Sequence, residues 1–249
     1  MTIIKAGPLE LEKVGDYPNI AEDPDAKPPA AIQKKFPKGA EDAQLSSDGM
    51  WFSTVEEEVQ VTEGKRKVKR ARRRLHWLAD GKLFVAKDLP VFHSVDFDEK
   101  AGVALLTGDR GEILRLDLAD QTITPIPLEG YELSASSCLQ GIHFLSGGRV
   151  LIHDVTEDGV LIVAKVGPKK LTLSSSFAFQ GDHIVVNGRV LVGGGMALSV
   201  LDLVKDKPKK LALVEELSCW MTWRRAPGKV RLYTHEAGAW DIRGFDAIA

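Results

Sequence analysis

Short apolar runs separated by turn-forming pairs constrain the fold of this chain more than any other feature. The run HIVVNGRVLV is the clearest case, because Asn187 and Gly188 tolerate the two positive φ angles of a type I′ turn between strands. Gly147–Gly148 and Asp80–Gly81 repeat the pattern, and residues 103–118 predict two strands joined by a four-residue loop. No segment of ten or more residues is a convincing amphipathic helix. We therefore predict an all-β chain, which disfavours parallel α/β folds.

Glycines also mark a repeat, each one at the expected turn between the first and second strands of a unit. Their spacings are 53, 45, 34 and 47 residues, about 45 on average, which is close to the length of a four-stranded repeat. Each unit has a third run with a polar end, such as ILRLDLAD at residues 113–120, and usually a fourth. We predict five units, the last without its fourth strand. The marking glycines are Gly49, Gly102, Gly147, Gly181 and Gly228.

The missing strand has a candidate at the start of the chain, in the run TIIKAGPLELEKV. A closed ring needs every strand edge paired, because an open edge presents unsatisfied backbone groups. We therefore expect residues near 2–13 to form a closing strand beside residues 239–244. Residues 14–42 are rich in proline and show no sustained period, so we expect an irregular segment with a turn or two of helix in PAAIQKKF. Residues 1–249 then form a single domain.

Three motifs in the third runs carry a family resemblance: LRLDL, SVLDL and WDI. They stand where WD-repeat and YVTN proteins place a Trp-Asp pair or its equivalent. Over about residues 43–249 the chain thus resembles the β-propeller superfamily. The resemblance and the unit count together predict a β-propeller of five four-stranded blades closed by the N-terminal strand. A double-sheet β-sandwich is the alternative.

Residues 56–74, EEEVQVTEGKRKVKRARRR, have the most uneven charge in the chain. A turn at Glu63 and Gly64 would fold the acidic arm onto the basic arm and place Glu58 opposite Lys69, a stabilising cross-strand pair. We predict a structural or partner-facing hairpin. Nucleic-acid contact is the less favoured alternative, because the net charge of the chain is −2 and the run lacks interleaved aromatic residues.

The six histidines follow no HExxH or HxH spacing. Neighbouring residues on a strand point to opposite faces, so metal ligands would have to converge from several units. We expect ordinary histidines, with no metal site and no cofactor. The serines near Cys138 lack a GxSxG elbow and predict no catalytic residue. Gly193–Gly195 is expected to be a flexible strand connection, because it opens no helix.

Composition favours a soluble cytoplasmic chain without membrane contact. The first residues lack the apolar core of a signal peptide, and no window approaches 18 consecutive apolar residues. Cys138 and Cys219 are 81 residues apart with no CxxC, which predicts buried free thiols in a reducing compartment. Of Trp220 and Trp223, one is expected to pack between units and the other to reach the rim.

In the propeller layout, loops between second and third strands and loops between units open on one face. That face would be mixed polar and aromatic, which suits binding another protein better than chemistry. We predict a non-enzymatic protein-binding propeller that acts as a scaffold or inhibitor. The alternatives are a metal-dependent small-molecule hydrolase of the lactonase type and a bacterial toxin-immunity protein. The predicted partner-binding residues are Glu63, Asp109, Arg110, Tyr131, Asp158, Trp220 and Glu236.

Overall fold

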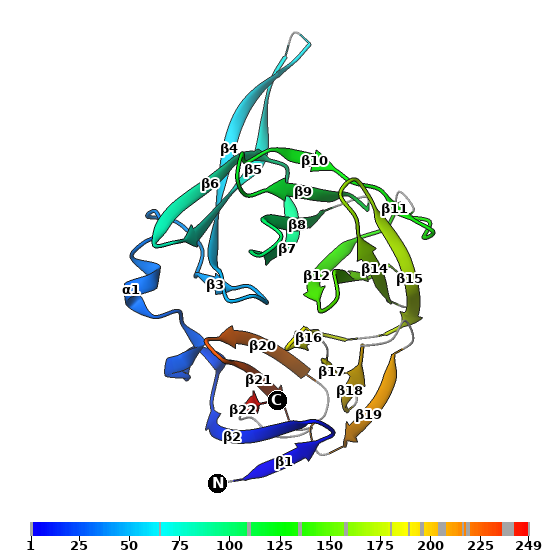
Figure 1. Cartoon of the computed structure of the whole chain (residues 1–249). Helices are drawn as coiled ribbons and strands as arrows, with labels where there is room; N and C mark the ends of the chain where they lie inside the picture. The colour runs from blue at the N-terminus through cyan, green and yellow to red at the C-terminus, as the bar shows by residue number, and fades with distance from the viewer. Residues whose placement is uncertain are drawn as a thin grey trace.

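The strands form five sheets, numbered here in chain order from β3 (Figure 1). The computed structural model describes residues 2–64, 66–108, 111–133, 136–156, 159–179, 181–188, 190–194, 197–203, 208–215, 217, 220–235 and 242–248. The first sheet contains β3 (Gln44–Leu45), β4 (Trp51–Glu63), β5 (Arg66–Ala79) and β6 (Lys82–Leu89). The second sheet contains β7 (Phe92–Asp98), β8 (Val103–Gly108), β9 (Ile113–Asp117) and β10 (Ile123–Pro125). The chain is all-β, as predicted.

The other three sheets follow the same up-and-down order. The third contains β12 (Leu139–Leu145), β13 (Arg149–Asp154), β14 (Val160–Val166) and β15 (Leu171–Ala178), with β11 (Leu128–Glu129) parallel to β15. The fourth contains β16 (His183–Val186), β17 (Val190–Gly194), β18 (Leu198–Asp202) and β19 (Lys209–Val214). The fifth contains β20 (Trp220–Ala226), β21 (Lys229–His235), β22 (Ile242–Ile248), β2 (Leu9–Tyr17) and β1 (Ile3–Ala6).

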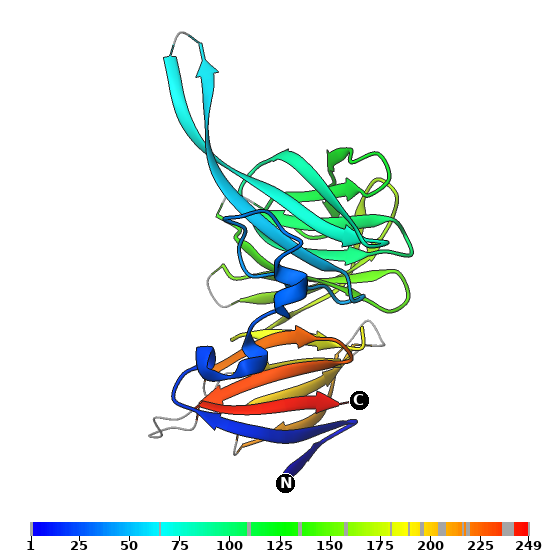
Figure 2. The same cartoon turned by 90° about the vertical axis from the view of Figure 1, so that its left-hand side faces the viewer.

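The N-terminal run pairs with the last strand of the chain. β2 lies antiparallel to β22, with Glu10 opposite Ile248 and Tyr17 opposite Ile242. This pairing occurs later in the sequence than we expected, because the run is not one strand. Gly7, at φ 62°, turns the chain so that β1 folds back on β2 as an outermost fifth strand. The two ends of the chain therefore share one sheet (Figure 2).

Apolar clusters join neighbouring sheets in four places. Buried residues alternate along the strands, so the second, third and fourth sheets each contribute to clusters on both of their faces. Among the described residues, no such cluster spans the fifth and first sheets. There the Arg224 guanidinium donates to the Ala43 carbonyl at 3.4 Å. Members of the four clusters include Trp77 and Phe97 (first and second sheets), Leu105 and Ile142 (second and third), Leu151 and Val185 (third and fourth), and Val200 and Phe245 (fourth and fifth).

Two predicted turns are confirmed and two assignments are wrong. Asn187 and Gly188 have φ angles of 51° and 61°, and Asp80 and Gly81 have 51° and 72°, as a type I′ turn requires. Gly181, however, lies between β15 and β16, so it joins two sheets. The run HIVV is the first strand of its sheet and not the second, and the Asn187–Gly188 turn is the one that corresponds to the other marking glycines.

The hairpin of β4 and β5 has a different register from the predicted one. Its turn lies between Glu63 and Arg66, which are paired, so Glu58 lies opposite Ala71. The shift of two residues keeps every side chain on its face, because the side-chain period of a strand is two. Glu58 still forms an ion pair with Lys69, at 2.7 Å, but diagonally across the strands.

The segment between β2 and β3 carries the helical turns η1 (Ile20–Glu22), η2 (Pro24–Ala26) and α1 (Ala30–Gln33) (Figure 2). The short helix expected in PAAIQKKF is α1, and Pro29 precedes it as the N-cap. The Asp23 carboxylate accepts hydrogen bonds from Tyr233 Oη at 2.9 Å and from Arg231, which ties the segment to β21. None of the described helices has the length and apolar content that a bilayer crossing requires.

Candidate functional site

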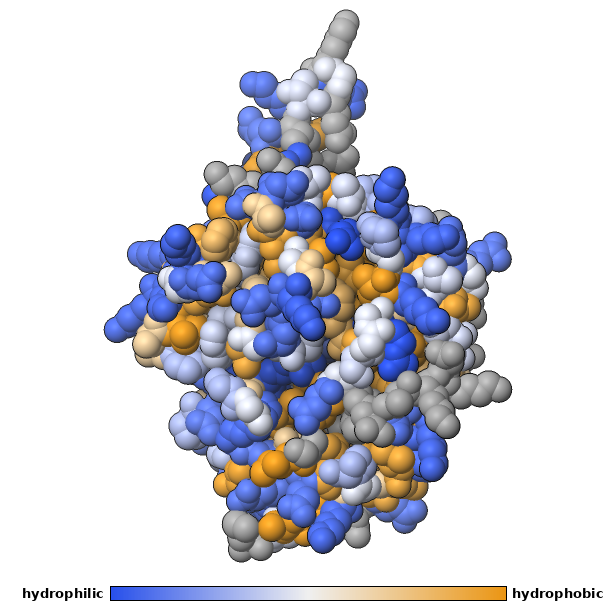
Figure 3. All heavy atoms as spheres, viewed as in Figure 1, coloured by the Kyte–Doolittle hydropathy of each residue, from blue (hydrophilic) through white to orange (hydrophobic). Residues whose placement is uncertain are grey.

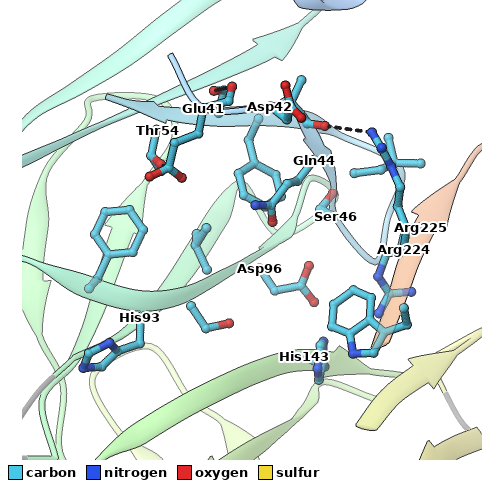
Figure 4. Close-up of a pocket in the computed structure, with 18 of the residues that line it drawn as sticks. Glu41, Asp42, Gln44, Ser46, Thr54, His93, Asp96, His143, Arg224 and Arg225 are labelled. Atoms are coloured by element: carbon cyan, nitrogen blue, oxygen red, sulfur yellow. Dashed lines mark hydrogen bonds between the residues drawn. The ribbon is translucent and has the colours of Figure 1, made fainter. Parts of the chain in front are cut away.

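A polar cavity of about 410 Å³ lies where the fifth sheet meets the first. Side chains from β3, β4, β7, β12 and β20 line it, and all of these except β4 are the first strands of their sheets (Figure 4). The lining contains acidic, basic and apolar side chains. Its charged residues are Glu41, Asp42, Asp96, Arg73, Arg224 and Arg225.

Asp96, on β7, is 2 % exposed and anchors the inner wall of the cavity. Its carboxylate accepts from the Ser47 amide at 2.8 Å, the Ser47 hydroxyl at 2.5 Å and the Phe144 amide at 2.8 Å. Burial raises the pKa of Asp96, while the charge of Arg225 and these hydrogen bonds oppose the shift. The carboxylate therefore links three sheets: the β3–β4 turn, β7 and β12.

Arg225, on β20, is the least satisfied charged group of the lining. It is 9 % exposed, and its Nη2 is buried with no hydrogen-bond partner in the described structure. Its guanidinium lies 5.9 Å from the centre of the Trp223 ring. Burial lowers the pKa of Arg225, against the charges of Asp96 and Asp48. Across the cavity, Arg73 Nη1 donates to the Phe92 carbonyl at 2.8 Å, but its Nε is buried without a partner.

A second cavity, of about 400 Å³, adjoins the first, and Ser94, His143 and Trp223 line both. Three histidines border it: His143 on β12, His153 on β13 and His183 on β16. The ring centres of His143 and His183 are 5.5 Å apart, and those of His153 and His183 are 4.8 Å apart. We call these three residues the histidine cluster.

The histidine cluster is uncharged at neutral pH. Burial lowers the pKa of His143 well below its usual value, with further repulsion from His183 and Arg225. Burial and the neighbouring His153 lower the pKa of His183 to about 3, and burial also lowers that of His153. The expectation of ordinary, separate histidines missed this convergence. The only hint in the sequence is that two of the three lie on strands that open successive units.

The described residues contain no group of three His, Cys, Asp or Glu side chains placed to hold a metal ion. Cys138 is a free thiol, half-buried instead of fully buried as we predicted, and Cys219 lies outside the described residues. Gly193 is not a flexible connection, because it is paired with His183 inside the β16–β17 ladder. A Cβ at this glycine would lie 1.9 Å from the Phe179 ring, so the close approach of that ring requires glycine.

Of the seven residues predicted to form the partner-binding face, the structure describes the side chain of one, Tyr131. Tyr131 is half-buried and packs against the core between the second and third sheets, and burial together with Asp154 raises its pKa. Trp223 is half-buried and lines both cavities. The remaining members of the face are Glu63 and Trp220, whose backbones lie in β4 and β20 but whose side chains are outside the described part, and Asp109, Arg110, Asp158 and Glu236, which lie outside the described residues entirely.

Comparison with solved structures identifies the fold. The β-propeller domain of Myceliophteria thermophila Cps50 (Swd1) aligns with 81% of this chain and 82% of its own, with a TM-score of 0.52 and 12% identity. TolB from Acinetobacter baumannii aligns with 83% of this chain, with a TM-score of 0.45 and 12% identity, and this chain spans about half of TolB, 54%. No family model and no curated protein sequence matches the chain.

Proposed function

Because this chain has the β-propeller fold, we propose that it is a non-enzymatic protein-binding domain that acts as an interaction scaffold or inhibitor. The observation that carries the proposal is the hairpin of β4 and β5, which projects beyond the body of the molecule in both views (Figures 1 and 2). We call its outer part, residues 55–63 and 66–72, the ribbon. A two-stranded arm held away from the core contributes little to the stability of the body, which favours a role in binding.

Both edges of the ribbon have backbone groups available for pairing. In the described structure, β6 pairs with β5 only from Arg73 to Ala79, and β3 pairs with β4 only at Trp51 and Phe52. Free edges of this kind accept an extended segment from another chain. Hydrophilic side chains lie on both sides of the ribbon (Figure 3).

The charge of the ribbon indicates what kind of segment fits. Residues 56–74 contain eight Lys or Arg and four Glu. Among the described side chains, Glu58 pairs with Lys69 and Glu57 with Arg74, both at close range, and Glu56 lies 4.0 Å from Arg73. The basic excess therefore favours an acidic partner segment. Two copies paired through the same edge, β4 on β4 or β5 on β5, would place like charges opposite each other, which opposes that mode of self-pairing.

The proposal extends to the architecture and the surrounding face. We propose that the five sheets act as blades of one domain and that the pairing of β2 with β22 closes the ring. The loop face with Tyr131 and Trp220 would then flank the ribbon, whose tip includes Glu63, and the protein would act in the cytoplasm. A toxin-immunity protein is a narrower form of the same function. The hydrolase alternative would need a constellation of metal ligands, which the described residues do not form.

A shortened hairpin tests the proposal. Glu56 and Arg73 are directly opposite each other, so replacing residues 57–72 with Asn-Gly closes the hairpin with a two-residue turn. The probe is a fluorescent peptide of alternating Glu and Val, measured by anisotropy against a peptide of alternating Lys and Val. We expect the full chain to bind the acidic peptide with an affinity that falls markedly as the salt concentration rises. The shortened variant should bind this peptide at least about tenfold more weakly.

Lys170→Gln serves as the control, because it removes a positive charge from an exposed position outside the ribbon, and it should bind the acidic peptide like the unmodified chain. Equal binding of the two peptides, or equal binding by the shortened variant, would contradict the proposal. Binding of duplex DNA in preference to the acidic peptide would favour the nucleic-acid alternative.

A further inference from the structure

Arg225 carries a buried positive charge that has no ion-pair partner among the described residues. Its side chain is almost fully buried, and an isolated buried charge costs far more than a neutral group unless it is paired. Arg231, on the neighbouring strand, shows the usual solution, because Asp23, Asp25 and Asp246 all accept hydrogen bonds from it. In contrast, no described carboxylate oxygen lies within 4.0 Å of the guanidinium nitrogens of Arg225.

Asp96 does not supply the missing partner. Its carboxylate accepts from the Ser47 amide, the Ser47 hydroxyl and the Phe144 amide, and forms no hydrogen bond or close ion pair with Arg225. It influences Arg225 only through its charge, and burial keeps that charge costly. Nη2 of Arg225 therefore stays a buried donor without an acceptor in the described structure. An unsatisfied buried donor beside a cavity is a position where a bound acceptor is expected.

The cavity determines which acceptor fits. Arg225 supplies one positive charge that no described carboxylate pairs with, which suits a monoanion, whereas a dianion would bring a second negative charge close to Glu41, Asp42 and Asp96. Phe52, Phe92 and Val95 supply apolar surface in the same cavity. A carboxylate matches the planar donor pair of a guanidinium, and the apolar walls accept a hydrocarbon or aromatic body.

We propose that this cavity is a binding site for an organic carboxylate, with Arg225 as its counter-ion and the apolar part of the ligand against Phe92 and Val95. The same chemistry could come from a free carboxylic acid or from the C-terminal carboxylate of a polypeptide. The site goes beyond the protein-binding function proposed above and does not depend on the ribbon.

Calorimetric titration of the full chain tests the site with four probes. They are 3-phenylpropanoate, inorganic phosphate, and acetyl-Ala-Phe with either a free C-terminal carboxylate or a C-terminal amide. We expect 3-phenylpropanoate to bind and phosphate not to bind. Binding of the peptide acid but not of the amide identifies a polypeptide terminus as an accepted source, and binding of 3-phenylpropanoate alone restricts the site to free acids.

Arg225→Gln should weaken carboxylate binding at least about tenfold, because it removes a charge-assisted bidentate pair. Arg149→Gln is the matched control, since Arg149 is 8 % exposed and has an unpartnered Nη1 but does not line this cavity. If Arg225→Gln does not fold, Arg225→Lys keeps the charge without the paired donors and should also weaken binding. Absence of binding to the unmodified chain at millimolar ligand, equal loss in Arg149→Gln, or preferential binding of phosphate would overturn the proposal.

Discussion

At the scale of residues, the molecule keeps several ionisable groups buried and partly unpaired near its centre. The histidine cluster is neutral because burial disfavours the imidazolium form, and each ring disfavours a charge on the next. Nε2 of His183 has no hydrogen-bond partner in the described structure. Protonation of the cluster is therefore disfavoured by burial, and only His153 has carboxylates near it, Asp154 and Asp182, that offset part of this cost.

This predicts a loss of stability on acidification. Burial lowers the pKa of His183 to about 3 in the folded state, whereas the unfolded chain keeps the ordinary value of 6.5. Between these values the unfolded chain binds a proton that the folded chain does not, so stability falls as the pH drops through this range. From pH 7 to pH 5 the contribution of His183 is a loss of about 2 kcal/mol in the free energy of unfolding. His143 and His153 act in the same direction, and the raised pKa of Asp96 acts in the opposite direction.

Urea unfolding at pH 7 and pH 5 measures the effect. His183→Phe should reduce the difference between the two pH values by about 2 kcal/mol. Ile184→Val, on the same strand, should lower stability by about 1 kcal/mol equally at both pH values, because it removes one buried methyl group and no titrating group. An unchanged pH dependence in His183→Phe would show that His183 is not held neutral by burial.

At the scale of elements, the irregular segment after β2 is held in place by buried charge. Burial alone would raise the pKa of Asp23, but hydrogen bonds from the Asp25 amide, Tyr233 and Arg231 keep it below its ordinary value. Arg231 also pairs with Asp246 on β22. One guanidinium thus fastens the segment to two strands of the fifth sheet.

Removing that guanidinium should be costly. Arg231→Met leaves Asp23 and Asp246 buried without their cation, which predicts a loss of about 3 kcal/mol in the free energy of unfolding. Hydrogen exchange should also accelerate over residues 18–43. Lys229→Met is the control, because its side chain is 33% exposed and its ion pair with Asp246 should contribute less than about 1 kcal/mol. Similar losses in the two variants would contradict the anchoring role of Arg231.

At the scale of the whole molecule, the first residues of the chain protect the last strand. β2 covers the edge of β22, and Leu9 and Leu11 are fully buried in the core shared by the fourth and fifth sheets. An uncovered β22 would expose both its backbone groups and this core.

Deleting residues 2–17 should therefore destabilise the chain by about 5 kcal/mol or more, from the loss of two buried leucines alone, and promote self-association. Light scattering after size-exclusion chromatography and urea unfolding measure the two effects. Deletion of residues 2–6 is the matched control, because it removes β1 but leaves β2 on β22. A monomer of unchanged stability after the longer deletion would show that β2 is dispensable.

The sequence by itself determined the features that depend on a few neighbouring residues. Asn187–Gly188 and Asp80–Gly81 adopt positive φ angles because small or glycine residues tolerate them, and the apolar runs around them become strands. The hairpin of β4 and β5 could also be predicted from its local sequence, but the register of its strands could not. Slipping by two residues preserves the faces, so local pattern cannot choose between the alternatives.

Only the tertiary structure decided which distant residues meet. His143, His153 and His183 come from two sheets, and Asp96 and Arg225 are separated by most of the chain, so no spacing rule brings either group together. The pairing of β2, and not β1, with β22 likewise joins the two ends of the sequence. Turns are determined by the torsional preferences of single residues. The cavity with its unpaired arginine depends instead on how whole sheets pack against each other, which no single stretch of sequence specifies.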